Sequence, residues 1–199
     1  GPPDHFFTDV KFRYMRAGGA QLDQPGGWVS GRYDRRWNAT RAQMLRTQAL
    51  GGTFVLLPHD LWGADGYPIS RFPGDNGDWT DYDNFLTRLI GDVRATGVPV
   101  QWDIWNEPDG TGFWQRGVNS AQYYQMWDTA VTEIRRLSPS ATIVGPSYSG
   151  YNHTWLDGFL GQTKTDGTLP SVLNWHFGSD PAADSSDAAS LVSAHGLSP

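Results

Sequence analysis

Cysteine is absent from the 199-residue sequence, which excludes a disulfide framework, a thiolate metal site and a cysteine nucleophile. Lysine occurs only at Lys11 and Lys164, and the formal net charge is −6. A nucleic-acid-binding surface needs clustered basic residues, so no nucleic-acid partner is expected. No apolar run approaches the roughly 20 residues that a transmembrane helix requires, so no membrane partner is expected either.

Two further features are scarce: basic and apolar stretches at the amino terminus, and glutamate among the acidic residues. The first ten residues, GPPDHFFTDV, lack the basic and apolar stretches of a secretory signal, so such a peptide is expected to have been removed or never to have existed. Glutamate occurs only at Glu107 and Glu133 among the 21 acidic residues. Aromatic residues, in contrast, make up 14% of the chain and include ten tryptophans. Tryptophan faces stack on flat apolar faces such as those of sugar rings, but they also fill cores, so composition leaves both uses open.

Short apolar runs alternate with longer amphipathic segments along the whole chain. The apolar runs predict strands at 10–18, 53–59, 98–107, 141–147 and 171–177. The amphipathic segments predict helices at 35–50, 78–96, 120–137, 154–163 and 184–196. Thr80 or Asp81 is expected to cap the second helix, and Asn119 or Ser120 the third. Strands with continuous apolar character that alternate with helices indicate a parallel sheet covered by helices.

The connections separate a barrel from an open sheet better than the elements do. Helix-to-strand connections are short, whereas long loops follow the first three strands and elaborate the carboxyl-terminal edge of the sheet. Active sites of (β/α)₈ barrels are built at that edge. Doubly wound sheets share this preference, but no early strand–loop–helix junction carries a G-x-G-x-x-G or P-loop pattern. The sequence therefore favours a (β/α)₈ TIM barrel.

A complete barrel needs eight such units and about 250 residues. Five units in residues 1–199 are expected to form part of a catalytic barrel, either as a fragment of a longer chain or together with a remaining barrel segment on another chain. The fragment is the simpler interpretation.

Glu107 lies in WDIWNEPDG (102–110), where the third apolar run gives way to a Gly-containing loop. An acidic side chain in a cleft beside Trp102 and Trp105 would be partly removed from water. A carboxylic acid that stays protonated near neutral pH can donate to a leaving oxygen. The alternative is that Asn-Glu-Pro is only a turn sequence, since all three residues suit strand ends.

The segment WDIWNEP (102–108) resembles the acid/base motif at the end of strand four in the retaining glycoside hydrolases of clan A, whose hallmark is Asn-Glu. The surroundings resemble most closely family 39, the β-xylosidase and α-L-iduronidase group. KFRYMRAGG (11–19) is similar to the second strand of that family with its arginine, and TIVGPSYSG (142–150) to the fifth. VLNWHF (172–177) resembles the sixth strand with its terminal histidine. The resemblance thus implies that the chain contains strands two to six of the barrel.

The resemblance also implies roles for single residues. Glu107 would be the general acid/base, and Asn106 would hold the hydroxyl beside the anomeric carbon. Arg16 would steady the nucleophile, and His176 would line the subsite wall. The remaining candidates for substrate contacts and stacking are His59, Asp60, Trp62 and Trp105.

Each of these assignments has a structural alternative. Arg16 could pair with any acidic neighbour, and His176 could be an interior histidine. His59 and Asp60 could suggest a metal site, but no His-x-x-x-His or carboxylate cluster completes one, so no metal and no organic cofactor are expected.

A retaining mechanism needs a second carboxylate as nucleophile. Glu133 lies in a predicted helix on the outer ring beside Arg135 and Arg136, and Asp103 lies about 13 Å below Glu107 along the strand at the usual rise per residue. Asp60 and Asp109 stand nearer the rim, but clan A nucleophiles are not found in those loops. The resemblance implies a glutamate on strand seven as the nucleophile, which is expected within a dozen or so positions beyond residue 199, on the next strand.

The resemblance implies a glycosidase that cleaves an oligo- or polysaccharide with net retention. The alternative is a catalytically silent carbohydrate-binding homologue. A barrel lyase or aldolase would need a Schiff-base lysine or a metal triad, and Lys11 and Lys164 lie at the edges of predicted elements.

Long loops that carry Trp28, Trp62 and Trp114 favour an extended cleft and hence an oligomeric or polymeric sugar. Two glycosylation sequons, at Asn38 and Asn152, and a polysaccharide substrate favour an extracellular location.

Overall fold

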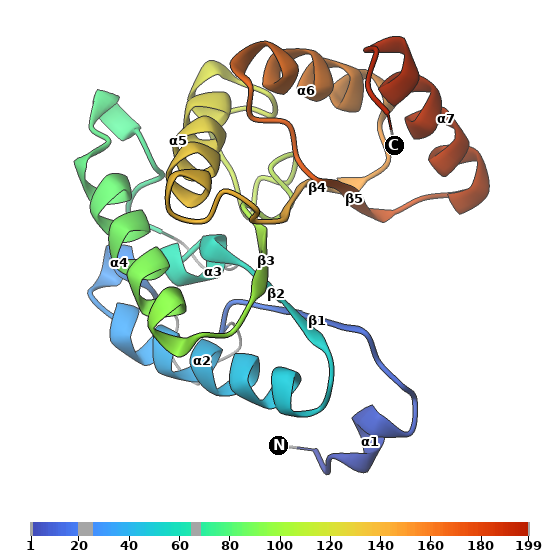
Figure 1. Cartoon of the computed structure of the whole chain (residues 1–199). Helices are drawn as coiled ribbons and strands as arrows, with labels where there is room; N and C mark the ends of the chain where they lie inside the picture. Colours follow the sequence, from blue (N-terminus) through green and yellow to red (C-terminus); the bar gives the residue numbers. More distant parts are fainter. Residues whose placement is uncertain (1, 20–25, 65–68, 199) are drawn as a thin grey trace.

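The computed structural model describes residues 2–19, 26–64 and 69–198. Five parallel strands form one sheet whose spatial order follows the chain order. They are β1 (Tyr14–Ala17), β2 (Thr53–Leu56), β3 (Val100–Asp103), β4 (Ile143–Gly150) and β5 (Val172–Phe177). Figure 1 shows that the sheet is curved and that the long helices follow one another around its outer side.

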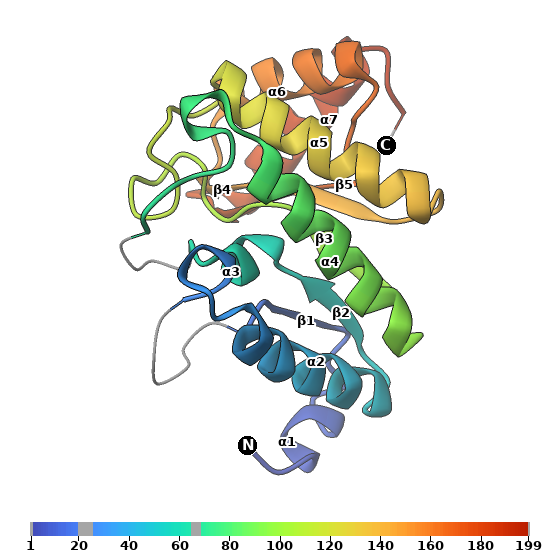
Figure 2. The same cartoon turned by 90° about the vertical axis from the view of Figure 1, so that its left-hand side faces the viewer.

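Every strand is followed by a long helix. These helices are α2 (Tyr33–Ala49), α4 (Thr80–Thr96), α5 (Ala121–Leu137), α6 (His153–Asp166) and α7 (Pro181–Ala194). Shorter elements are α1 (His5–Thr8), α3 (Pro58–Trp62) and the 3₁₀ turns η1 (Trp28–Ser30) and η2 (Asp75–Gly77). Figure 2, turned by 90°, shows the long helices stacked beside one another from α2 to α6. The arrangement is about half of a (β/α)₈ barrel, so the predicted fold class is confirmed.

The N-caps of α5 and α4 can be compared with the caps predicted from the sequence, and the prediction for α4 is wrong. Ser120 is the N-cap of α5, and its side chain accepts the N–H of Tyr123 at 3.2 Å, as one of the two sequence alternatives required. Neither Thr80 nor Asp81 caps α4: its N-cap is Trp79, and Asp78 accepts the N–H of Thr80 at 2.9 Å instead. Asp78 lies two residues before the free N–H of Thr80, and an aspartate carboxylate at this spacing accepts such an N–H in a local turn.

Two predicted strands end earlier than expected. The run 53–59 stops at Leu56, because Pro58 begins the short helix α3, which carries His59 and Asp60. The run 98–107 leaves the sheet after Asp103, and Glu107 has a backbone φ of 42°, which a strand cannot contain. Both changes place polar residues in compact turns above the sheet.

The core lies between the sheet and the helices and is rich in aromatic side chains. Trp127 and Phe159, for example, meet edge to face with ring centroids 4.9 Å apart and are fully buried. Of the three loop tryptophans that favoured an extended cleft, Trp62 and Trp114 belong to this core, and the partly buried Trp28 packs against it. Trp62 is 1% exposed and Trp114 2% exposed, and Trp28 packs against Tyr33 and Phe85.

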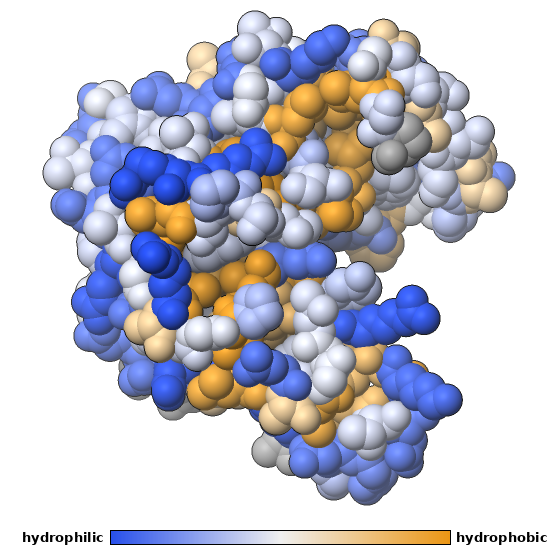
Figure 3. Space-filling view, in the orientation of Figure 1, coloured by the Kyte–Doolittle hydropathy of each residue, from blue (hydrophilic) through white to orange (hydrophobic). Residues whose placement is uncertain are grey.

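β1 and β5 form the edges of the sheet and pair with one neighbour each among the described strands. Beside β5, an apolar groove of about 380 Å³ opens between α6 and α7. Leu160, Leu173, Trp175 and Val192 are among the residues that line it. Figure 3 shows the exposed apolar surface in this region, over α6 and α7 near the carboxyl end.

Parts of the long loops predicted after the first two strands, 20–25 and 65–68, lie outside the described residues. Within the described ranges, no helix combines the length and the apolar character needed to cross a bilayer. Asn38 of the first sequon is exposed on α2, and Asn152 of the second is the N-cap of α6.

Candidate active site

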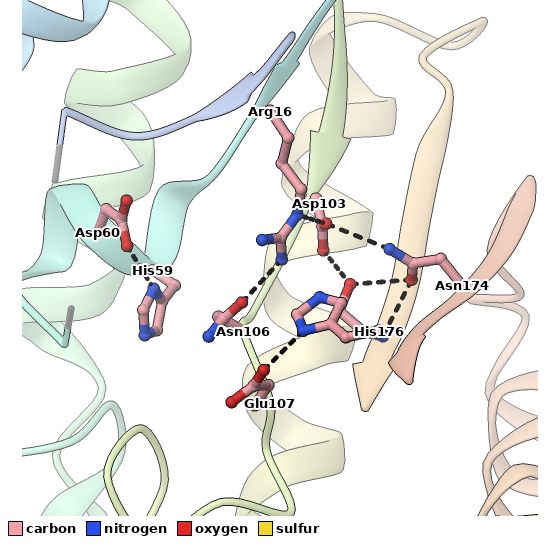
Figure 4. A network of polar contacts seen from close by, with 9 residues as sticks. Arg16, His59, Asp60, Asp103, Asn106, Glu107, Asn174 and His176 are labelled. Carbon is pink, nitrogen blue, oxygen red and sulfur yellow. Dashed lines mark hydrogen bonds and ion pairs between the residues drawn. The ribbon is translucent and has the colours of Figure 1, made fainter. Parts of the chain in front are cut away.

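Side chains from β1, from the turn after β3 and from β5 meet at the carboxyl ends of the sheet (Figure 4). Arg16 comes from β1, and Asn106 and Glu107 come from the turn after β3. Asn174 and His176 come from β5. Four of the residues predicted to form the site, Arg16, Asn106, Glu107 and His176, are therefore brought together.

The backbone of Glu107 is fixed from both sides. Its N–H donates to the carbonyl of Ser147 on β4 at 2.8 Å, and its own carbonyl accepts the N–H of Gly110 at 2.8 Å. Its φ of 42° lies in the left-handed region, which costs a non-glycine residue about 1 kcal/mol or more and persists only where the surroundings hold it. The side chain thereby turns out of the strand direction, and it remains 20% exposed.

The turn beyond Glu107 is tied to β4 by a second set of bonds. Asp109 accepts the N–H of Ser149 at 2.8 Å, and its other oxygen lies 2.5 Å from the hydroxyl of Ser149. Since Glu107 is bonded to Ser147 and Asp109 to Ser149, two successive points of the turn run alongside β4. The turn is therefore held as part of the sheet edge.

The carboxyl group of Glu107 contacts a single titratable neighbour among the described residues. Nδ1 of His176 lies 2.7 Å from Oε1 of Glu107, and the two side chains are 22% and 20% exposed. Nε2 of His176 is buried and has no hydrogen-bond partner in the described part of the chain. The histidine thus orients the carboxyl group that the sequence predicts as acid/base.

Arg16 links Asn106 to a buried carboxylate. Its Nε lies 2.6 Å from Oδ2 of Asp103, and its Nη2 donates to Oδ1 of Asn106 at 3.0 Å. Arg16 therefore has the acidic partner that one interpretation of the sequence anticipated. Its expected role at a nucleophile stays a prediction.

Asp103 itself is fully buried below the exposed groups. Its Oδ1 lies 2.5 Å from the hydroxyl of Ser147, and its Oδ2 lies 3.4 Å from Nδ2 of Asn174. The side-chain oxygen of Asn174 accepts the backbone N–H of Ser147 at 3.0 Å. This cluster connects β3, β4 and β5 by polar contacts (Figure 4).

His59 and Asp60 lie on the same face but are enclosed. Nδ1 of His59 contacts Oδ1 of Asp60 at 2.8 Å, and the two residues are 1% and 6% exposed. The imidazole ring meets Trp105 and Phe113 edge to face, with centroids 5.0 and 5.5 Å away. In Figure 4, Asn106 lies between His59 and His176. The expected contact of His59 and Asp60 with sugar hydroxyls therefore stays a prediction, and both residues are buried in this structure.

Trp62 and Trp105 differ from the expectation of open stacking faces. Each is 1% exposed, and each indole N–H is used internally, by Arg71 O at 3.2 Å and by Phe113 O at 3.1 Å respectively. Their rings pack against Tyr82 and Trp114. An indole with both its faces and its N–H engaged fills the core below the site and offers no platform.

Glu133 lies on the outer helix α5, as its sequence position predicts. Both of its carboxylate oxygens bond Arg136, at 2.7 and 2.8 Å, and this hydrogen bonding lowers the pKa of Glu133.

In the described residues, no group of three or more His, Cys, Asp or Glu side chains is arranged to hold a metal ion.

Sequence reasoning missed Ser147 and Asn174, and considered Asp103 and Asp109 only as nucleophiles. An aspartate in an otherwise apolar strand, four residues before Glu107, was a usable signal, because a buried charge requires partners. The partners themselves lie 44 and 87 residues away in the sequence and carry no local pattern.

Comparisons with known proteins bear on the fold and the sequence of the chain. No protein-family model matches the chain. A curated relative, 3-O-β-L-arabinopyranosyl-α-L-arabinofuranosidase of Bifidobacterium pseudocatenulatum, is 30% identical over 127 residues, which cover 52% of this chain and 13% of that protein.

Solved structures match almost the whole chain. N2152 from Neocallimastix frontalis is 25% identical with a TM-score of 0.71, over 97% of this chain and 45% of that one. A family 39 β-xylosidase from Caulobacter crescentus is 19% identical with a TM-score of 0.63, over 98% of this chain and 46% of that one. The chain thus spans less than half of these proteins. It has the fold of barrel glycosidases, and in sequence it is related to a glycoside hydrolase.

Proposed function

We propose that residues 1–199 are the strand-two to strand-six part of a retaining glycoside hydrolase of clan A, most similar to family 39. The observation that carries this proposal is the placement of Glu107. Its carboxyl group is 20% exposed at the carboxyl ends of the strands, beside Asn106 and 2.7 Å from His176. Barrel enzymes build their active sites at this edge.

In the proposed mechanism, Glu107 is first a general acid. It gives its proton to the glycosidic oxygen as the bond to the anomeric carbon breaks, while a carboxylate nucleophile attacks that carbon from the opposite face. Glu107, now a carboxylate, then takes a proton from the water that displaces the nucleophile and releases the sugar. His176 orients the carboxyl group in both steps.

The nucleophile is proposed to be a glutamate on the next strand, beyond residue 199. Asp103 is unsuitable, because its carboxylate is fully buried and contacts Arg16 and Ser147. Glu133 is unsuitable, because it pairs with Arg136 on the outer helix. We propose that this missing part lies on the same polypeptide, with a second chain as the alternative source.

The proposed substrate is an oligo- or polysaccharide, and the proposed location is extracellular. The curated relative is named as an arabinopyranosyl-arabinofuranosidase and one similar structure as a β-xylosidase, so arabinosides and xylosides are the first substrates to test. The burial of Trp62, Trp105 and Trp114 means that an extended cleft would need other side chains for stacking.

The test is hydrolysis by the complete gene product, followed by proton NMR of the first-formed anomer. A retaining glycosidase releases a sugar with the anomeric configuration of its substrate. An inverted product, or a protein that hydrolyses no glycoside, contradicts the proposal. Measurable sugar affinity without hydrolysis would instead support the catalytically silent binding homologue.

A further inference from the structure

Asp103 is the last residue of β3 and lies directly beneath the exposed groups of the site. Its side chain has no exposure to solvent, and contacts from three different strands engage its carboxylate. Removing a carboxylate from water is costly unless such bonds replace its hydration. The sequence therefore maintains a buried charge here at a cost, and Arg16 is the cation that balances it.

Arg16 connects the buried carboxylate of Asp103 to the side chain of Asn106. Its side chain is 32% exposed, so without a fixed partner it would sample several rotamers. Asp103 holds Nε at 2.6 Å, and the guanidinium is planar, so fixing Nε also fixes the direction in which Nη2 points. Nη2 is directed at Oδ1 of Asn106, 3.0 Å away.

This bond decides how Asn106 can act. Because Oδ1 accepts from Arg16, the amide oxygen faces the guanidinium and the amide nitrogen is turned away from it, as the group available to a ligand. The amide nitrogen is a donor only. Asn106 directly precedes Glu107, so the donor stands beside the proposed proton-transfer group.

We propose that Asp103 is a positioning residue that acts through Arg16 to orient Asn106 as the donor to the substrate hydroxyl next to the reacting carbon. The inference rests on the proposed function. It implies that the preference for glycosides carrying that hydroxyl depends on a carboxylate that never touches the sugar.

The first test compares two substrates in the complete gene product. Asp103→Asn should lower kcat/KM about 10- to 100-fold on a glycoside that carries the hydroxyl, mainly through kcat. On the matched 2-deoxy glycoside the loss should stay below about threefold, because the oriented donor has no partner there. Glu133→Gln, which removes a carboxylate on the outer helix, is the control and should change neither value.

The second test is a double-mutant cycle. If Asp103 works through Asn106, Asp103→Asn combined with Asn106→Ala should be no slower than Asn106→Ala alone. Losses that multiply in the double variant, or a loss from Asp103→Asn that is equal on both substrates, overturn the inference. Ser147→Ala keeps the charge of Asp103 and removes one bond to it. This variant should show the same substrate dependence with a smaller loss, and it carries the test if Asp103→Asn does not fold.

A readout without catalysis separates this inference from the proposed function. In ¹⁵N-arginine-labelled protein, the Nε–H of Arg16, assigned by its loss in Arg16→Lys, should exchange slowly with water. It should exchange at the rate of a free arginine in Asp103→Asn. Equal, fast exchange in both proteins overturns the positioning inference even if the protein is a glycosidase. Slow exchange in a protein that cleaves no glycoside leaves Asp103 as the anchor of Arg16 and refutes the proposed function alone.

Discussion

Glu107 and Ser147 are joined by a backbone hydrogen bond of 2.8 Å although both have left-handed backbone angles, with φ of 42° and 59°. A register shift in the pairing of β4 with β5 falls at Ser147, between Pro146 and Tyr148. The strained turn that aims Glu107 is thus matched by an irregularity in the neighbouring strand. Backbone strain of this kind is found mainly at functional sites, and it persists only where the surrounding structure holds the strained residues in place.

The first prediction concerns the tie between Asp109 and Ser149. Asp109→Asn removes the charge that accepts both donors of Ser149 and frees the turn that carries Glu107. We expect kcat to fall by about tenfold or more, because a small misplacement of a reacting group is costly. Steady-state kinetics of the complete gene product measures this effect. A variant with unchanged kcat would show that the turn is held without Asp109.

The second prediction concerns His176. Its Nδ1 contact with Glu107 orients the proposed acid, so His176→Ala should slow cleavage of poor leaving groups by about 10- to 100-fold. His176→Gln keeps a polar group near the same position and should lose less. Both rates can be measured with alkyl glycosides. If the two variants lose equally, the histidine contributes something other than a hydrogen bond.

The third prediction concerns an ion pair that joins two loops of the carboxyl-terminal face. Both oxygens of Asp75 bond Arg116, each at 2.7 Å. Burial alone would raise the pKa of Asp75. Hydrogen bonds from Arg116, the Phe72 N–H and Gln122 outweigh burial and lower the pKa from 3.8 to about 2.

A carboxyl whose pKa is lower in the folded state stabilises the fold above its unfolded value. The contribution of Asp75 is therefore present above pH 3.8 and is lost as the pH falls through about 2. We expect Asp75→Asn to remove on the order of 1–2 kcal/mol at neutral pH, after allowance for the partly exposed Arg116. Urea unfolding at several pH values measures this. The difference between wild type and variant should shrink below pH 4, and a constant difference would refute the pH linkage.

The sequence predicts the fold more completely than it predicts the candidate site. The five strands, the five long helices and the turn at Glu107 follow from apolar runs and their spacing, which are local properties. The contact of Arg16 with Asp103 joins residues 87 positions apart and depends on the pairing of β1, β2 and β3. No local pattern encodes such a contact, so the buried half of the site could not be predicted.

The tryptophans show a different limit. Trp62, Trp105 and Trp114 follow strand ends, where a binding loop and a core-covering loop have the same composition. Only the packing of each loop against its neighbours decides between these uses, and here each of the three rings is at most 2% exposed.

The fourth prediction follows from that burial. Trp114 packs against Phe72, Trp105 and Tyr123, so Trp114→Ala should destabilise the fold by about 3–5 kcal/mol. Thermal unfolding measures the loss. Trp114→Phe is the matched variant and should lose less, because it keeps an aromatic ring. A Trp114→Ala protein of normal stability but weaker sugar binding would restore the stacking role.

The most direct measurement of the central claim is the leaving-group dependence of Glu107→Gln in the complete gene product. Glutamine keeps the shape of the side chain and can still bond His176, but it cannot give up a proton to the leaving oxygen. Single-turnover cleavage of alkyl glycosides should fall about 10³-fold or more, whereas release of an activated phenolate, which needs no proton, should stay within about tenfold of wild type. An equal loss on both substrates, or no loss on either, would contradict the assignment of Glu107 as the acid.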